Sequence, residues 1–143
     1  MQYTNDLTVL LRTATPATGV LKFEVSSQLN ANELNATNWL IQSIGGNITA
    51  LAENNPDGQE NPDLFWRGGK IDIKHITGGL NALSKRVQHA MKQTNKNGAL
   101  VDISATLFSN EAAIKVAINR LRVSGGNYVI LIRDNQLVGY ISK

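Results

Sequence analysis

The sequence has no cysteine and only two histidines. The absence of cysteine excludes disulfide bonds, thiolate metal sites and cysteine nucleophiles, so the fold has to be stabilised by its core alone. It fits a reducing compartment without proving one. Ser27 and Ser84 have no histidine and acid in a suitable pattern, which argues against a serine hydrolase. A P-loop and a GxGxxG fingerprint are also absent.

Long apolar runs are missing as well. No stretch reaches the roughly 18 apolar residues of a membrane span, so we expect none. The first residues, MQYTNDLTVLLRT, lack the charged segment that opens a secretory signal, so we expect no signal peptide there. The chain has 143 residues, of which 42% are hydrophobic and 17% charged, which is typical of one folded domain.

The charge balance is mildly basic. The net charge is +3, and the isoelectric point is about 9.3. This permits a polyanionic partner but does not require one, because many unrelated enzymes are equally basic.

The hydrophobic pattern predicts alternating helices and strands. Apolar positions at helical spacing predict helices at 32–44, with Asn32 as the cap, and at 80–94 and 110–123. Residues 7–12 are a strand or a helical turn. Strands are predicted at 20–25, 47–53, 62–66, 70–76, 99–104, 127–133 and 137–142. This order predicts a single α/β domain around one mixed sheet flanked by helices.

Charged residues interrupt one predicted hairpin, NPDLFWRGGKIDIKH, which turns at Gly68–Gly69. Residues two apart in a strand share a face, so Asp72 and Lys74 point the same way. Asp63, on the partner strand, can fall beside Asp72. Two neighbouring carboxylates repel unless a cation lies between them, and Mg²⁺ prefers such oxygen ligands. A bound metal would also make a nucleophile of its water.

Glu33 is a second charged residue in an unusual place. It lies in the first turn of the predicted helix, on the stripe that continues through Ala36 and Leu40. A carboxylate on a core-facing stripe needs a partner or a metal ion. Because this helix directly precedes the charged hairpin, its start can meet the two aspartates.

Together these residues resemble the PD-(D/E)xK nuclease superfamily, which has the restriction-endonuclease-like fold. Pro62-Asp63, an eight-residue gap and Asp72-Ile73-Lys74 match its motif, and Glu33 matches its upstream glutamate. The resemblance covers about residues 30–104, between an N-terminal extension (1–29) and a C-terminal helix and strand hairpin (105–143).

The resemblance also implies roles for these residues. It makes Asp63, Asp72 and the backbone carbonyl of Ile73 metal ligands, Lys74 the catalytic lysine, and Glu33 an accessory acid that supports the metal. The expected metal is Mg²⁺ or Mn²⁺. Zn²⁺ is the alternative, against which the scarcity of cysteine and histidine argues.

Within the superfamily, the chain is most similar to nuclease domains of contact-dependent growth inhibition and other polymorphic toxins. There a helix ending in glutamine follows the lysine strand, as Gln93 does here. This implies delivery into a target bacterium as part of a larger protein, cleavage of tRNA or DNA in the cytoplasm, and a cognate immunity protein. The alternatives are a DNA endonuclease of a restriction, repair or mobile-element system, and a non-catalytic nucleic-acid- or protein-binding module.

The helix after the hairpin is basic on one predicted face. Its candidate substrate-binding residues are Lys85, Arg86, His89, Lys92, Gln93 and Lys96. A basic face beside a metal site suits a phosphate backbone. An ordinary solvated helix face explains it equally well. His75 is expected to pack or to lie at the surface, and Asp102 to cap a neighbour or to bond within the site.

Each charged residue also has an ordinary explanation when taken alone. Asp63 can simply open a strand, Asp72 and Lys74 can form a surface ion pair, and Glu33 can be a favourable first-turn charge. The combination of all four in one expected arrangement favours a catalytic site.

Overall fold

The computed structural model describes residues 2–24, 27–52 and 64–143. Over these ranges the elements are β1 (Thr4–Asn5), α1 (Leu7–Leu11), β2 (Leu21–Phe23), α2 (Ala31–Ser43), β3 (Ile48–Ala50), β4 (Leu64–Trp66), β5 (Gly69–His75), α3 (Leu80–Gln93), β6 (Gly98–Asp102), α4 (Asn110–Ser124), β7 (Tyr128–Arg133) and β8 (Gln136–Ser142). None of the helices in these ranges is long and apolar enough to cross a membrane.

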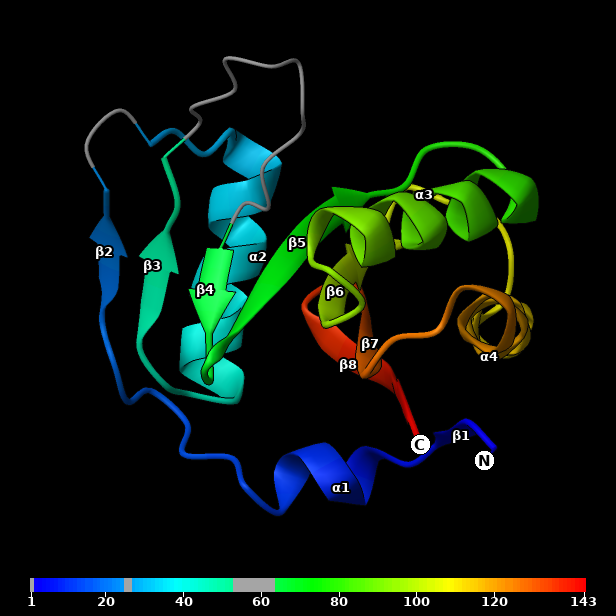
Figure 1. Cartoon of the computed structure of the whole chain (residues 1–143), viewed down its shortest axis with the longest axis horizontal. Helices are drawn as coiled ribbons and strands as arrows, with labels where there is room; N and C mark the ends of the chain where they lie inside the picture. The colour runs from blue at the N-terminus through cyan, green and yellow to red at the C-terminus, as the bar shows by residue number, and fades with distance from the viewer. Residues whose placement is uncertain (1, 25–26, 53–63) are drawn as a thin grey trace.

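The strands form one mixed sheet in the order β1-β8-β7-β6-β5-β4-β3-β2. The pairs β2–β3, β5–β6 and β6–β7 are parallel, and the remaining neighbours are antiparallel. The prediction of an α/β domain around one mixed sheet is confirmed. The first and last strands pair with each other, which brings the two termini close together (Figure 1).

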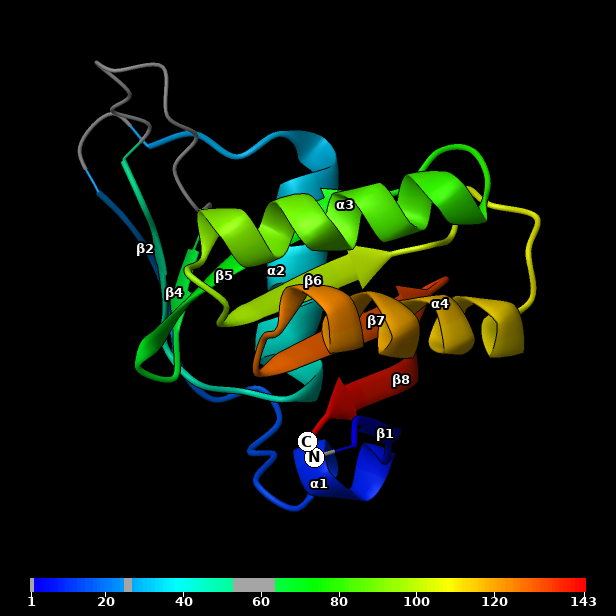
Figure 2. The same ribbon diagram turned by 45° about the vertical axis from the view of Figure 1, so that its right-hand side comes forward.

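The helices cover both faces of this sheet. Figure 2 shows α3 and α4 side by side in front of β6 and β7, with α2 behind them. Side chains of the central strands point alternately to the two faces of the sheet, because successive residues in a strand face opposite ways. Ala99 and Val101 join the core under α3 and α4, while Leu100 and Ile130 join the core that includes α2. These central positions are fully buried.

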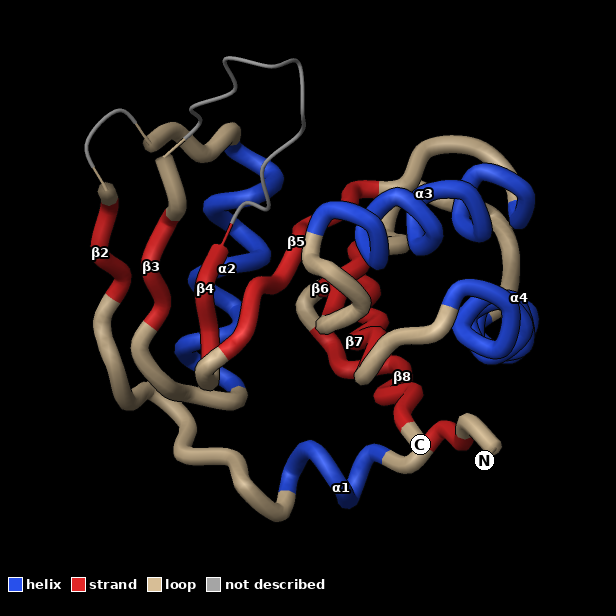
Figure 3. The backbone as a smooth tube through the Cα atoms, in the orientation of Figure 1, coloured by secondary structure: helices blue, strands red, loops and turns tan. Residues whose placement is uncertain are grey.

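The charged hairpin forms as predicted, but its turn lies one residue earlier. Arg67 and Gly68 have positive φ angles of 49° and 78°, and Gly69 is already the first residue of β5. Two consecutive positive φ angles are what a tight two-residue hairpin turn requires. The turn joins β4 to β5 at the lower end of both strands in Figure 3. Beyond the turn, β5 pairs with β6, so the hairpin is fixed to the centre of the sheet.

Two helix boundaries differ from the prediction. The cap of α2 is Asn30 rather than Asn32, because Asn30 and Glu33 form a reciprocal capping box. Helix α3 ends at Gln93, so Lys96 lies in the following turn with a φ of 61°. The segment 7–12, predicted to be a strand or a helical turn, is helical: α1 covers Leu7–Leu11 and has Asp6 as its cap.

Candidate functional site

A cavity of about 270 Å³ lies where the start of α2, the strand β5 and the helix α3 meet. Glu33, Asp72 and Lys74 all line it, together with Ile73, so four of the five residues predicted for catalysis and metal binding lie around one space. Asp63, the remaining predicted residue, belongs to 53–63 and lies outside the described residues. The complete lining is Asn30, Asn32, Glu33, Asp72, Ile73, Lys74, His75, Arg86 and Gln93.

The central feature of this cavity is an ion pair on β5. Lys74 Nζ lies 2.9 Å from Asp72 Oδ2, and the two side chains are 11% and 2% exposed. Among the described residues, Asp72 Oδ2 has no hydrogen-bond donor besides this ion-pair contact. Burying a carboxylate costs free energy unless charges or donors compensate it. The burial excludes the surface ion pair that would have been the ordinary explanation.

Gln93 holds the lysine from the opposite side. Its Oε1 accepts a hydrogen bond of 3.0 Å from Lys74 Nζ. The ammonium group therefore lies between the Asp72 carboxylate on its own strand and an amide on α3. A lysine has three N–H donors, so within the described residues these two contacts leave one donor for a ligand in the cavity.

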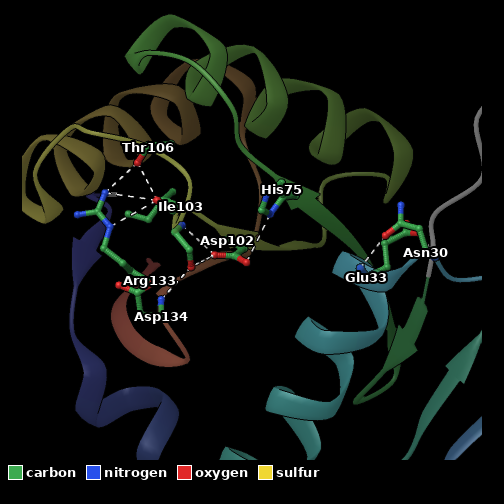
Figure 4. A network of polar contacts seen from close by, with 9 residues as sticks. Asn30, Glu33, His75, Asp102, Ile103, Thr106, Arg133 and Asp134 are labelled. Carbon is green, nitrogen blue, oxygen red and sulfur yellow. Dashed lines mark hydrogen bonds and ion pairs between the residues drawn. The ribbon is translucent and has the colours of Figure 1, made fainter.

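Glu33 reaches the cavity from the first turn of α2. Its Oε1 accepts a hydrogen bond of 2.9 Å from the Asn30 backbone N–H, and Asn30 Oδ1 accepts one of 2.8 Å from the Glu33 backbone N–H. Figure 4 shows this pair at the start of the helix. The carboxylate is therefore held in place while remaining half-buried at the cavity, rather than in the core.

His75 and Asp102 form a further polar contact that was not predicted for this site. His75 Nδ1 lies 3.5 Å from Asp102 Oδ2, and Figure 4 shows the imidazole near the end of β5 turned toward that carboxylate. Asp102 Oδ1 accepts a hydrogen bond of 2.9 Å from the Ser104 backbone N–H. The two residues are directly opposite each other in the β5–β6 register. His75 also lines the cavity. The sequence had predicted only that it packs or lies at the surface.

The predicted basic face of α3 is divided between two places. Arg86 and Gln93 line the cavity of Asp72 and Lys74. Lys92 and Lys96 instead line a second cavity, between α3 and α4. Lys85 and His89 are exposed and line neither of these two cavities. The residues predicted to bind substrate therefore lie on both flanks of α3 and on its outer surface.

The donors at the first cavity are oxygen atoms of the kind that hard divalent cations prefer. Glu33 and Asp72 supply carboxylates, and the Ile73 carbonyl is a further candidate ligand. In the described ranges, no group of three His, Cys, Asp or Glu residues gathers close enough to hold one metal ion. Asp63, the third predicted carboxylate, falls outside those ranges. The donor chemistry therefore fits Mg²⁺ or Mn²⁺, and the expected metal stays a prediction.

Comparison with known proteins gives one structural relationship. No protein-family model matches the sequence, and no curated protein matches it. The fold is similar to that of a chain in the CdiA-CT/CdiI toxin and immunity complex from Burkholderia pseudomallei, with a TM-score of 0.60 and 17% sequence identity. The match covers 88% of this chain and 99% of that chain. At this level of identity the likeness shows a shared fold.

Proposed function

We propose that this chain is the nuclease domain of a bacterial toxin of the contact-dependent growth inhibition type. It cleaves phosphodiester bonds of tRNA or DNA with the help of a divalent metal. The observation that carries this proposal is the buried Asp72–Lys74 pair at a cavity that Glu33 also lines. A restriction-endonuclease-like core over residues 30–104 belongs to the same proposal.

The structural relative is one chain of a complex that contains a toxin and an immunity protein. Two features favour the toxin role for this chain. A paired carboxylate and ammonium at the edge of a cavity can act on a substrate, whereas a protein that only blocks a toxin has no need of them. The sequence between Asp72 and Asp102 also contains no acidic residue, which suits a polyanionic substrate.

The residues at the cavity have separate roles in this mechanism. Lys74 donates its remaining N–H to a phosphate oxygen and stabilises the negative charge that develops there. Asp72 and Gln93 fix the position of the ammonium group. Arg86, exposed on α3, binds a neighbouring phosphate.

Asp72, Glu33, the Ile73 carbonyl and Asp63 would hold the metal ion. When bound, such an ion activates water for attack on phosphorus and neutralises phosphate charge. Glu33 would bind it directly or through water, while its capping contact with Asn30 keeps the carboxylate at the cavity.

The decisive test is cleavage of total tRNA and plasmid DNA with Mg²⁺, Mn²⁺, Zn²⁺ or EDTA. Asp72→Asn and Lys74→Gln should both lose activity, and Lys74→Gln by about 10²–10³-fold, as expected for loss of one stabilising donor. Lys70→Gln is the matched control, because Lys70 lies on the same strand and at the same parity but is exposed and lines neither cavity. Circular dichroism establishes that each variant is folded. Absence of cleavage by the folded wild type with every metal would contradict the proposal.

Toxicity distinguishes a toxin from another endonuclease. Expression in bacteria without a partner should arrest growth, and Lys74→Gln should relieve the arrest while Lys70→Gln should not. Co-expression of a small protein encoded directly downstream should protect the cells. Strong cleavage of duplex DNA without toxicity would instead favour a restriction or repair nuclease.

A further inference from the structure

Among the residues that the structure describes, cations and no acid line the second cavity. It has a volume of about 310 Å³ and lies between the C-terminal halves of α3 and α4. Lys92, Lys96 and Arg120 supply its charges, and Met91 and Val123 supply apolar surface. The complete lining is Gln88, Met91, Lys92, Asn95, Lys96, Arg120, Val123 and Ser124.

Local contacts position Arg120 and the segment that carries Lys96. Arg120 Nε donates a hydrogen bond of 2.9 Å to Ser84 Oγ on α3. Lys96 lies in the turn after α3, where its backbone N–H donates to the Met91 carbonyl at 2.7 Å. A Cβ on Gly125 would lie 3.5 Å from Lys96 Cδ, so the lysine stem runs along this glycine. The Arg120 guanidinium is therefore fixed at the cavity, and the backbone at Lys96 is fixed beside it.

These charges are not neutralised by neighbouring carboxylates. Throughout the described ranges, no carboxylate lies within ion-pair distance of Lys92, Lys96 or Arg120. Like charges around one cavity repel each other, and an anion placed between them removes that repulsion. The polar groups of Gln88, Asn95 and Ser124 can add hydrogen bonds to such an anion.

We infer that the α3–α4 cavity binds a phosphate group of the nucleic acid other than the one that is cleaved. This inference rests on the proposed function. The two cavities flank α3, and the exposed Lys85 and His89 lie on that helix without lining either cavity. A helix is about 10–12 Å wide, which is more than one step of the phosphate backbone. A strand crossing α3 therefore places a phosphate a few nucleotides from the cut into the second cavity.

Helix electrostatics offer an ordinary explanation for part of this surface. Lys92 lies in the last turn of α3, where the helix dipole favours a cation. That explanation predicts that loss of the lysine changes stability and leaves nucleic-acid affinity unchanged. It also leaves unexplained why Arg120 is fixed to Ser84 at the same cavity.

Binding measurements in EDTA test the inference without cleavage. The probes are fluorescein-labelled tRNA and single-stranded DNA, read by fluorescence anisotropy with the full chain. Arg120→Gln and Lys96→Gln should each bind about ten-fold more weakly. Each should also lower the slope of log affinity against log salt by about one. Lys115→Gln, an exposed residue of α4 that lines neither cavity, should bind like the wild type.

Substrate length gives a second readout. A labelled dinucleotide carries a single phosphodiester and cannot span both cavities, so its affinity should depend far less steeply on salt than that of the long probes. Tight binding of the long probes by the wild type, with no change in Arg120→Gln and Lys96→Gln, would overturn the inference while the proposed function stands. A wild type that cleaves no nucleic acid and binds none would overturn both.

Discussion

The two cavities beside α3 differ in the balance of their charges. The one at β5 contains a buried carboxylate paired with a lysine and a second carboxylate on α2. The cavity between α3 and α4 contains two lysines and an arginine, and no acid among the described residues. Only the first can combine a cation-binding carboxylate with an N–H donor. The second is suited to holding an anion without acting on it.

Under the proposed function, this contrast would separate chemistry from binding on a small domain. Carboxylates at the first cavity repel a polyanion unless a cation intervenes, so a polyanionic substrate would have to be attracted by neighbouring surfaces. Exposed cations on α3 and in the second cavity would supply that attraction. The same contrast should appear in the stability of variants, which is measured without any substrate.

The largest effect on stability is expected at the buried ion pair. Lys74→Met leaves the Asp72 carboxylate buried and uncompensated, which should lower the free energy of unfolding by about 3–5 kcal/mol. Adding Asp72→Asn should recover most of this loss, because the remaining amide is neutral. Urea denaturation of the single and double variants measures both changes. Equal stability of the wild type and Lys74→Met would show that the carboxylate is not buried as described.

A smaller loss is expected at Gly126, in the loop after α4. Gly126 has a φ of 148°, and a Cβ there would overlap Met91 Sδ. Gly126→Ala should therefore destabilise the chain by about 1–3 kcal/mol through overpacking, in addition to backbone strain. Gly68→Ala is the matched control, since Gly68 has a φ of 78° but no atom within 4 Å of its Cβ. Thermal unfolding should rank Gly126→Ala below Gly68→Ala, and the reverse order would refute the described packing.

The capping box of α2 should affect stability and activity together. Asn30→Ala removes the side-chain acceptor for the Glu33 backbone N–H and should cost about 0.5–2 kcal/mol. Ser109→Ala removes the comparable cap of α4, which lies away from the first cavity. We expect similar losses in unfolding free energy from both, but reduced cleavage only from Asn30→Ala. Equal cleavage by the two variants would show that the position of Glu33 does not affect activity.

The smallest effect on stability is expected at the second cavity. Lys96 is exposed and has no ion-pair partner within the described residues, so Lys96→Gln should change the free energy of unfolding by less than about 0.5 kcal/mol. Chemical denaturation beside the anisotropy measurements checks this. A large loss of stability would show that Lys96 has a structural role.

Much of the fold was predictable because its local signals are strong. Apolar residues at helical spacing located α3, and Leu83, Val87 and Ala90 are indeed fully buried. Short segments were harder. Residues 7–12 are apolar without a clear period, and Asn30 and Asn32 are equally good caps until the pairing of Asn30 with Glu33 decides between them.

The candidate site was predictable where its residues are close in sequence. Asp72 and Lys74 share one face of one strand, and their contact follows from the strand period. Arg120 could not be found in this way, because its contact with Ser84 joins residues 36 positions apart and depends on how α3 packs against α4. The pairing of His75 with Asp102 likewise required the register of two parallel strands.

Steady-state cleavage of one long substrate by Lys74→Gln and Arg120→Gln tests the division of roles most directly. We expect Lys74→Gln to lower kcat, because the lost Lys74 N–H acts on charge that develops in the transition state. Arg120→Gln should raise KM and leave kcat unchanged, because its phosphate contact is made equally before and during the reaction. A fall in kcat with Arg120→Gln, or unchanged kcat with Lys74→Gln, would contradict the account.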